Sequence, residues 1–207
     1  MFLDMDRTYS EYKSWLGDAD IDRNTASLYQ KASEMLKCKE DFESQLMALD
    51  EQESELKDEE RNFEQRLSIY SSYLEHEFKQ SGDPARIQNL YERRVTDLCL
   101  HPHVWTTYID YIDHTLRVES VSLKVCERAI RNISHSAAIW IRYLRALERY
   151  KKSNEIVLST VEKALSCNLL EGLSKYREIW LTYIDYKRRD MCQVIRHSNF
   201  VDKSGCN

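Results

Sequence analysis

Residues 83–147 read DPARIQNLYERRVTDLCLHPHVWTTYIDYIDHTLRVESVSLKVCERAIRNISHSAAIWIRYLRAL, and this stretch decides the fold. It contains one helical unit written twice, because WTTYI at 105–109 returns 35 residues later as WIRYL at 140–144. Between these copies, YER at 91–93 returns at the same spacing as CER at 126–128. Two interleaved motifs that share one period indicate an array of helical hairpins.

The same signature continues on both sides of this stretch. YSSYL at 70–74 stands 35 residues before 105–109, and WLTYI follows at 180–184. A single hairpin cannot bury both of its apolar faces, so neighbouring hairpins must stack. We therefore predict an all-α fold, a right-handed α-solenoid of about four and a half hairpins over residues 1–190. Its structural core is predicted to contain the aromatic pairs Trp105, Tyr108, Trp140, Tyr143, Trp180 and Tyr183.

Two segments are expected to depart from short hairpins. Residues 41–80 contain neither Gly nor Pro, and their apolar residues follow alternating steps of four and three, interrupted by Glu53 and Glu60. This spacing predicts one long helix that extends the array, of about 60 Å at about 1.5 Å per residue. A two-stranded coiled coil is the alternative, and the two acids at core positions disfavour it. Residues 191–207 are expected to be a disordered, non-repeat tail. No polar capping helix closes the predicted array, so the chain reads as a fragment or truncated form of a longer array.

The composition favours helices and excludes several other classes of protein. Only 4 Gly and 2 Pro occur in 207 residues, fewer than tight-turned sheets require. The sequence lacks a signal peptide and an apolar run of about 20 residues, so we expect a soluble, intracellular protein without a membrane segment. The six Cys show no C-x-x-C spacing and are expected to be reduced thiols.

Catalytic and metal-binding signatures are not found in the sequence. It has no G-x-S-x-G motif, no Gly-rich phosphate loop and no H-E-x-x-H motif, so we predict no enzyme activity and no cofactor. His101, His103 and His114 flank a predicted turn without a second ligand cluster at zinc-like spacing, so no metal site is predicted.

The charge is unevenly distributed along the chain. The net charge is −5, but residues 37–66 hold eleven acids and five bases, whereas residues 117–152 hold nine bases and three acids. The second segment supplies a candidate partner-binding basic surface, and the alternative is an ordinary solvated face. Without interleaved aromatic residues for base stacking, an acidic protein is a more natural partner than RNA. The candidate residues are Arg117, Lys124, Arg128, Arg131, Arg142, Arg145, Arg149, Lys151 and Lys152.

A W-x-x-Y helix followed by a helix that carries Glu-Arg, repeated at about 35 residues, resembles the half-a-TPR (HAT) repeat. GDPARIQ at 82–88, AIRN at 129–132 and EIW at 178–180 are similar to HAT arrays of factors that recycle the U4/U6 small nuclear RNPs. The resemblance implies a non-enzymatic protein–protein interaction scaffold in pre-mRNA splicing. It also implies a location in the nucleoplasm and Cajal bodies, with some protein in the cytoplasm.

The partners that this resemblance implies are proteins of the splicing machinery, principally of the U4/U6 snRNP, with RNA contacted indirectly. Histones, deubiquitinases and homodimerisation are implied only for a full-length family member. Another RNA-processing HAT scaffold, from the U1 snRNP or the polyadenylation machinery, is the first alternative. A prenyltransferase α-type subunit also stacks Trp-bearing hairpins, but that family typically has Arg three residues after the Trp, where this chain has Tyr.

Overall fold

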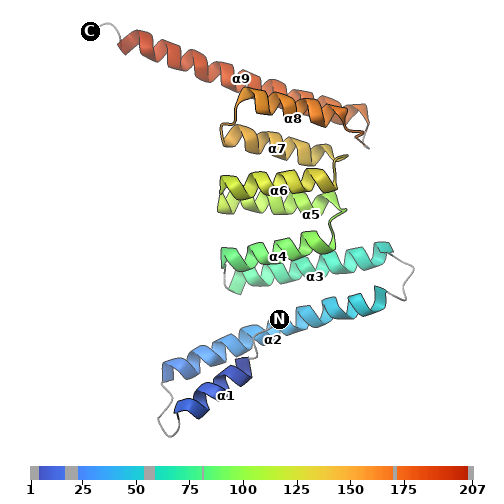
Figure 1. The fold of residues 1–207 in the computed structure, drawn as a ribbon, viewed down its shortest axis with the longest axis vertical. Helices are drawn as coiled ribbons and strands as arrows, with labels where there is room; N and C mark the ends of the chain where they lie inside the picture. Colours follow the sequence, from blue (N-terminus) through green and yellow to red (C-terminus); the bar gives the residue numbers. More distant parts are fainter. Residues whose placement is uncertain (1–4, 17–22, 54–58, 81, 170–171, 205–207) are drawn as a thin grey trace. The chain divides into compact units, whose positions relative to one another are not determined.

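The computed structural model describes residues 5–16, 23–53, 59–80, 82–169 and 172–204 (Figure 1). It comprises two compact units, unit 1 (Met1–Leu90) and unit 2 (Tyr91–Asn207). Every regular element within the described ranges is helical, which confirms the predicted all-α class. Unit 1 contains α1 (Met5–Leu16), α2 (Arg23–Glu53), α3 (Glu59–Gln80) and the first half of α4 (Pro84–Asp97). Unit 2 contains the rest of α4, α5 (Pro102–Tyr111), the π-helical turn η1 (Ile112–Leu116), α6 (Glu119–Asn132), α7 (Ala137–Arg149), α8 (Asn154–Ser166) and α9 (Leu173–Ser204).

The long helix predicted over residues 41–80 is corrected by the structure, in which α2 and α3 form an antiparallel pair. The Phe42 ring stacks on Tyr73 with ring centroids 4.9 Å apart. One turn further from the reversal, Lys39 pairs with Glu77 at 3.0 Å. The contact that lies farther from the reversal joins residues that are farther apart in the sequence, which is the pattern of a chain that folds back on itself.

The reversal has a simple energetic reason. The apolar positions of α2 meet those of α3, so Leu46, Leu49, Tyr70 and Leu74 are all buried. A straight helix would leave both apolar stripes in water, at a cost of about 25 cal/mol for each Å² of apolar surface. The two acids that interrupt the predicted series lie at the ends of the pair, and residues 54–58 fall outside the described residues.

The connection from α3 to α4 uses the backbone freedom of a glycine. Gly82 has φ +56°, and its N–H donates to the Glu77 carbonyl at 3.0 Å. Asp83 then caps α4, because its Oδ1 accepts from the Ala85 N–H at 3.0 Å. Pro84 begins the helix, where its missing N–H has no partner to lose.

We predict that Gly82→Ala lowers the free energy of unfolding by about 1–2 kcal/mol, because a side chain disfavours a positive φ. The added Cβ itself meets no crowding, since its nearest neighbour is the Phe78 carbonyl at 3.9 Å. Asn adopts a positive φ more readily than Ala, so Gly82→Asn should lose less in the same urea titration. Equal losses in the two variants would contradict the backbone explanation.

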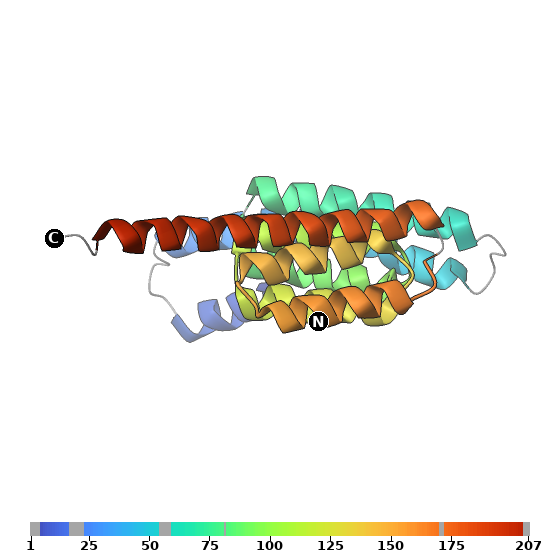
Figure 2. The ribbon, with the colours of Figure 1, turned by 90° about the horizontal axis from the view of Figure 1, so that it is seen from above.

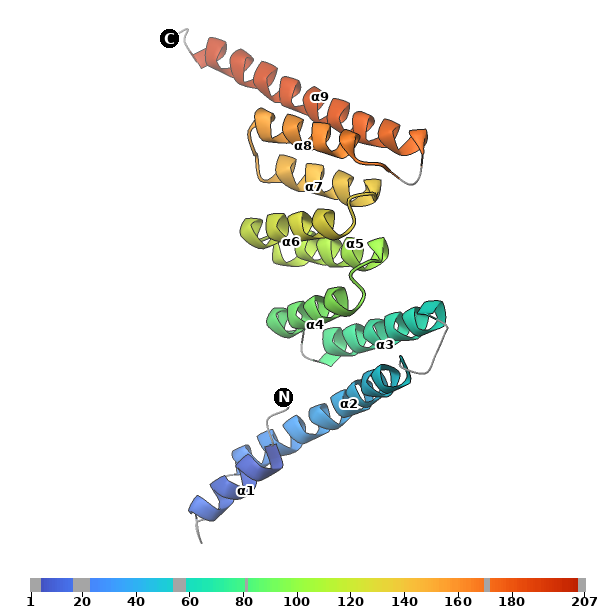
Figure 3. The same ribbon diagram turned by 45° about the vertical axis from the view of Figure 1, so that its right-hand side comes forward.

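Unit 2 is built from successive helical layers. α5, α7 and α9 follow one another as neighbours, while α6 packs on α5 and α7, and α8 packs on α7 and α9. Figure 3 shows this succession, and Figure 2 looks down on α9 with α8 beside it. Because each hairpin buries its apolar face against the next, the predicted solenoid of stacked hairpins is confirmed. One core cluster comprises Ala137, Trp140, Leu144, Leu147, Val157, Val161, Ala164, Leu169 and Ile179.

The disordered tail predicted for residues 191–207 is also corrected, because α9 continues as a helix to Ser204. The sequence from Leu173 to Ser204 contains neither Gly nor Pro, so no residue in it breaks the backbone hydrogen-bond ladder. A weak apolar period does not by itself end a helix. Residues 205–207 lie outside the described residues. Within the described chain, no helix is both long and apolar enough to span a membrane.

Candidate interaction surface

Four different side chains meet where α4, α5 and α6 pack in unit 2. The Tyr108 hydroxyl donates to Glu92 Oε1 at 2.7 Å, and Arg128 binds both carboxylate oxygens of Glu92, at 2.9 and 2.8 Å. The Arg128 guanidinium also lies 5.6 Å from the centre of the Trp105 ring. The bidentate pair and the cation–π contact together hold α6 to α4 and α5.

The electrostatics of this cluster follow from its geometry. Burial would raise the pKa of Glu92, but hydrogen bonds from Arg128 and Tyr108 outweigh burial and leave the pKa below its usual value. The hydrogen bond to Glu92 likewise raises the pKa of Arg128. A lowered carboxyl pKa stabilises the fold above the unfolded pKa, and this contribution is lost as the pH falls through the folded pKa.

The indoles of two successive hairpins make the same bond to the loop before them. Trp105 Nε1 donates to the Cys99 carbonyl and Trp140 Nε1 donates to the Ser134 carbonyl, both at 2.8 Å. The two side chains are 1% and 4% exposed. Each indole therefore fills the core and satisfies its polar atom on a carbonyl six residues earlier, which is the arrangement that buried Trp requires.

Ion pairs also link successive hairpins. Arg142 of α7 binds both oxygens of Asp110 of α5, at 2.9 Å each. Arg149 binds the buried Asp113 at 2.8 Å, and Asp113 also accepts from the Ser122 hydroxyl at 2.7 Å. These acids lie at the end of α5 and in η1, where the π-helical turn ends at Arg117 with φ +53°.

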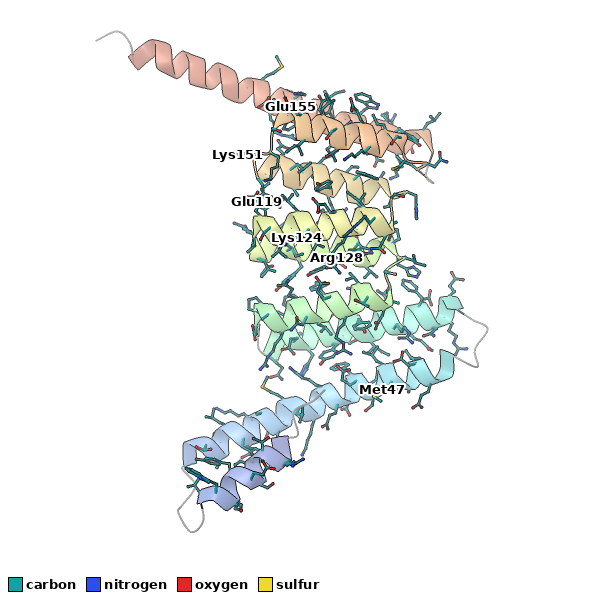
Figure 4. All side chains as sticks on the ribbon, viewed as in Figure 1. Met47, Glu119, Lys124, Arg128, Lys151 and Glu155 are labelled. Carbon is teal, nitrogen blue, oxygen red and sulfur yellow. The ribbon has the colours of Figure 1, made fainter. Side chains whose placement is uncertain are left out.

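These pairs divide the predicted basic surface into two classes. Four of its nine residues bind acids of neighbouring helices, and these are Arg128, Arg142, Arg149 and Lys152. The other five are exposed and have no acidic partner among the described residues, and these are Arg117, Lys124, Arg131, Arg145 and Lys151. In the view of Figure 4, Lys124 and Lys151 are interspersed with Glu119 and Glu155. The set of exposed cations without an acidic partner among the described residues therefore comprises five of the nine.

The sequence that forms these hairpins matches a known repeat family. The family described as pre-mRNA-splicing factor Syf1/CNRKL1 N-terminal HAT repeat matches residues 89–204. The chain belongs to the HAT repeat family. The resemblance inferred from the 35-residue period is thereby confirmed.

Several curated proteins similar to this HAT chain share one description, "Spliceosome associated factor 3, U4/U6 recycling protein". The Homo sapiens protein is 36% identical over 186 residues, which is 90% of this chain and 18% of the relative. The Danio rerio protein is 33% identical over 187 residues, again 90% of this chain and 18% of the relative. The Caenorhabditis elegans protein is 32% identical over 117 residues, which is 56% of this chain and 14% of the relative. The chain thus spans less than a fifth of the length of these relatives.

The prediction that Trp180 lies in the core of the HAT array is wrong, because its side chain is 46% exposed. The buried position beside it belongs to Ile179, which is 0% exposed. Trp180 follows Trp140 by 40 residues instead of 35, and it is the eighth residue of α9, whereas Trp140 is the fourth residue of α7. The fourth residue of α9 is Tyr176. The loop bond is made instead by Tyr176, whose hydroxyl donates to the Cys167 carbonyl at 2.8 Å. Tyr143 and Tyr183 are partly buried against the core.

An apolar groove on α9 was not predicted from the sequence. The groove has a volume of about 410 Å³ and is lined by Tyr183, Ile184, Lys187, Arg188, Met191 and Cys192. Ile184 and Met191 are exposed, and the Lys187 ammonium lies 5.7 Å from the centre of the Tyr183 ring. A signal for it was present in the sequence, because Ile184 and Met191 lie seven residues apart and therefore on one side of the helix.

The HAT core contains a thiol that its environment makes unreactive. Burial raises the pKa of Cys126 to about 12, and the side chain is 0% exposed. We predict that iodoacetamide at pH 8 alkylates the exposed Cys192 and leaves Cys126 unmodified until urea unfolds the chain. Peptide mass mapping with and without urea measures this difference. Because the folded state keeps the proton, Cys126 stabilises the fold fully below the unfolded pKa of about 9, and this contribution is lost as the pH rises toward 12.

Among the described residues, no three His, Cys, Asp or Glu side chains lie close enough together to hold a metal ion. His101 and His103 lie at the start of α5, and His114 lies in η1, where its Nδ1 is 2.7 Å from the Asp110 carbonyl. The side chains with unusual environments in unit 2, such as Glu92 and Arg128, bind one another across helices. Their perturbed pKa values are explained by packing of the HAT array.

Proposed function

We propose that this HAT chain is a non-enzymatic, protein-binding scaffold in pre-mRNA splicing and forms part of a nuclear factor that recycles or assembles the U4/U6 snRNP. The observation that carries the proposal is the similarity to U4/U6 recycling proteins along 90% of the chain. Because the matched region is under a fifth of those proteins, the proposal assigns this chain a binding role within such a factor.

The packing of unit 2 supports a role in binding partners over its outer surface, as opposed to a role in catalysis. Trp105 and Tyr108 are buried, so these aromatic residues of the repeat build the stack and are not available to a ligand in solution. The polar groups of the repeat, such as Glu92 and Arg128, are bound to each other. An extended series of helices offers a long outer surface, which is how solenoid proteins bind partners.

We further propose that the five exposed cations of unit 2 contact an acidic protein surface. Lys124 and Arg131 lie two turns apart on α6, so they project from one side of that helix. Their exposure means that contacts with a partner would be screened by salt, with a Debye length of about 10 Å at 0.1 M. Complexes held by this surface should therefore weaken as the ionic strength rises.

Affinity purification from nuclear extract tests the proposal. The tagged chain serves as bait at about 0.1 M and at about 0.5 M salt, and recovered proteins and small nuclear RNAs are identified by mass spectrometry and sequencing. We expect enrichment of U4/U6 snRNP proteins at low salt, with U4 and U6 RNA recovered through those proteins. Recovery of U1 snRNP or polyadenylation factors instead would assign the chain to a different HAT scaffold.

A pair of charge-reversal variants locates the surface. Lys124→Glu with Arg131→Glu should reduce recovery of the partners at least tenfold at low salt. Lys31→Glu with Lys37→Glu reverses the same number of exposed charges on α2 and should leave recovery unchanged. Equal recovery with both baits, each shown to be folded by circular dichroism, would overturn the assignment of the basic surface.

A further inference from the structure

A cavity of about 370 Å³ opens where α6, α7 and α8 meet in unit 2. Its wall combines the Trp140 indole with the Tyr143 phenol and with charged groups of both signs, which belong to Glu127, Arg131 and Lys163. The Tyr143 hydroxyl lies 3.4 Å from Glu127 Oε1, so the phenol and the carboxylate point toward each other.

The same position one hairpin earlier is filled by an arginine of the chain itself. Four of the wall residues have an equivalent of the same or similar type 35 residues earlier, namely Glu92 for Glu127, Trp105 for Trp140, Tyr108 for Tyr143 and Arg128 for Lys163, whereas Arg131 corresponds to Thr96. At the earlier position the Arg128 guanidinium binds both oxygens of Glu92 and lies over the Trp105 ring. The preceding hairpin therefore shows that a guanidinium fits against a carboxylate, a phenol and an indole placed in this way.

Lys163 does not reproduce what Arg128 does. Its side chain is exposed, and within the described part of the chain no cation pairs with Glu127. An ammonium is a point charge that cannot bind a carboxylate with two parallel bonds or stack as a plane on an indole. The carboxylate, phenol and indole are thus retained without the guanidinium that occupies them in the preceding hairpin.

We propose that this cavity binds an arginine side chain of a partner protein, with the guanidinium paired to Glu127 and lying against the Trp140 ring, as Arg128 does with Glu92 and Trp105. The other charged groups that face the cavity are the cations Arg131 and Lys163. They disfavour a polybasic segment and would pair with acids on either side of the inserted arginine. The preferred ligand is therefore an arginine flanked by Asp or Glu in an extended peptide.

This site depends on the proposed function only in that its ligand is a protein, and it can be tested without nuclear extract. A fluorescein-labelled peptide Glu-Asp-Arg-Asp-Glu is titrated with the purified chain and followed by anisotropy. The comparison peptides replace the arginine with lysine or with citrulline, which keeps the shape and removes the charge. We expect the arginine peptide to bind at least tenfold more tightly than either, and to shift the Trp140 indole N–H resonance.

The sharpest variant is Lys163→Arg, which leaves the net charge unchanged. It should let the chain fill its own cavity, as in the preceding hairpin, and so weaken peptide binding at least tenfold while raising Tm. Glu127→Gln on α6 should also weaken binding at least tenfold, whereas Glu155→Gln at the start of α8 is a control that should not. Unchanged binding in Lys163→Arg, or equal binding of all three peptides, would overturn the proposal, and the second outcome would identify an anion site formed by Arg131 and Lys163.

Failure of this test and failure of the proposed function can be told apart. A chain that recovers splicing proteins but ignores the arginine peptide retains the scaffold role and loses the cavity as its contact. A chain that binds the peptide but recovers no splicing protein retains the arginine site in a different process.

Discussion

Replacing Trp105 with alanine is expected to lower the free energy of unfolding by roughly 3–5 kcal/mol, the range for a large aromatic residue removed from a core. The side chain is 1% exposed, so its loss leaves a cavity that rigid neighbouring helices can only partly close. The substitution also removes the bond to the Cys99 carbonyl and the ring beneath Arg128. Urea titration of the whole chain, followed by circular dichroism, measures the loss.

The matched control is Trp180→Ala, which removes the same atoms from the same sequence motif. Because Trp180 is 46% exposed, the expected loss is about 1 kcal/mol or less. A structure in which all W-x-x-Y motifs were equivalent would give equal losses. Equal results for the two variants would therefore contradict the distinction between the buried and exposed indoles.

Arg149→Met is expected to lower the free energy of unfolding by roughly 2–3 kcal/mol, because it leaves the buried Asp113 carboxylate without its cation. Removing one partner of a fully buried ion pair costs about 3–5 kcal/mol. The expected value is smaller here because the Arg149 side chain is 41% exposed and Ser122 continues to donate to Asp113. Methionine keeps most of the apolar stem, so the measurement reports mainly the charge.

Two further variants separate this charge effect from a loss of packing. Arg145→Met changes an exposed arginine on the same helix and should cost no more than about 0.5 kcal/mol. Adding Asp113→Asn to Arg149→Met removes the uncompensated charge while keeping an acceptor for Ser122, and it should recover most of the lost stability. If the double variant is no more stable than Arg149→Met alone, the ion pair does not explain the effect.

The repeat could be predicted from sequence because period and residue type coincide. Trp105 and Trp140 occur 35 residues apart with Tyr three positions later, and both lie in the core. The shift to 40 residues before Trp180 was visible, but its effect depends on how the longer connection before α9 is accommodated. Local pattern cannot supply that information.

The predicted long helix over residues 41–80 and the predicted disordered tail beyond residue 190 were wrong for different physical reasons. Over 41–80 the apolar stripe was read correctly, but a stripe does not show whether its partner is another molecule or the next part of the same chain. The antiparallel contact between Phe42 and Tyr73 supplies that partner. Beyond residue 190, lack of periodicity was taken for disorder, although α9 remains helical to Ser204.

Four cations of the predicted basic surface pair with acids about 32–36 positions away in the sequence, and local charge counting could not show these pairs. The surroundings of Arg94 also could not be predicted from the local sequence. It stands where Ala129 and Ala164 stand in the following hairpins, and its side chain is 4% exposed, with Nη1 3.4 Å from the Thr107 hydroxyl. Burial lowers the pKa of Arg94 accordingly.

The hydrogen bond from each buried indole to the preceding loop restricts the length of that loop. Trp105 and Trp140 each reach a carbonyl six residues earlier, so an insertion or deletion of one residue in that interval would carry the acceptor out of range. Before α9 the donor and acceptor are nine residues apart, and the hydrogen bond to the Cys167 carbonyl is made by the hydroxyl of Tyr176. Among homologues, length variation between hairpins should therefore be accompanied by replacement of the aromatic residue that spans the gap, whereas the turns inside hairpins, free of this constraint, should vary in length independently.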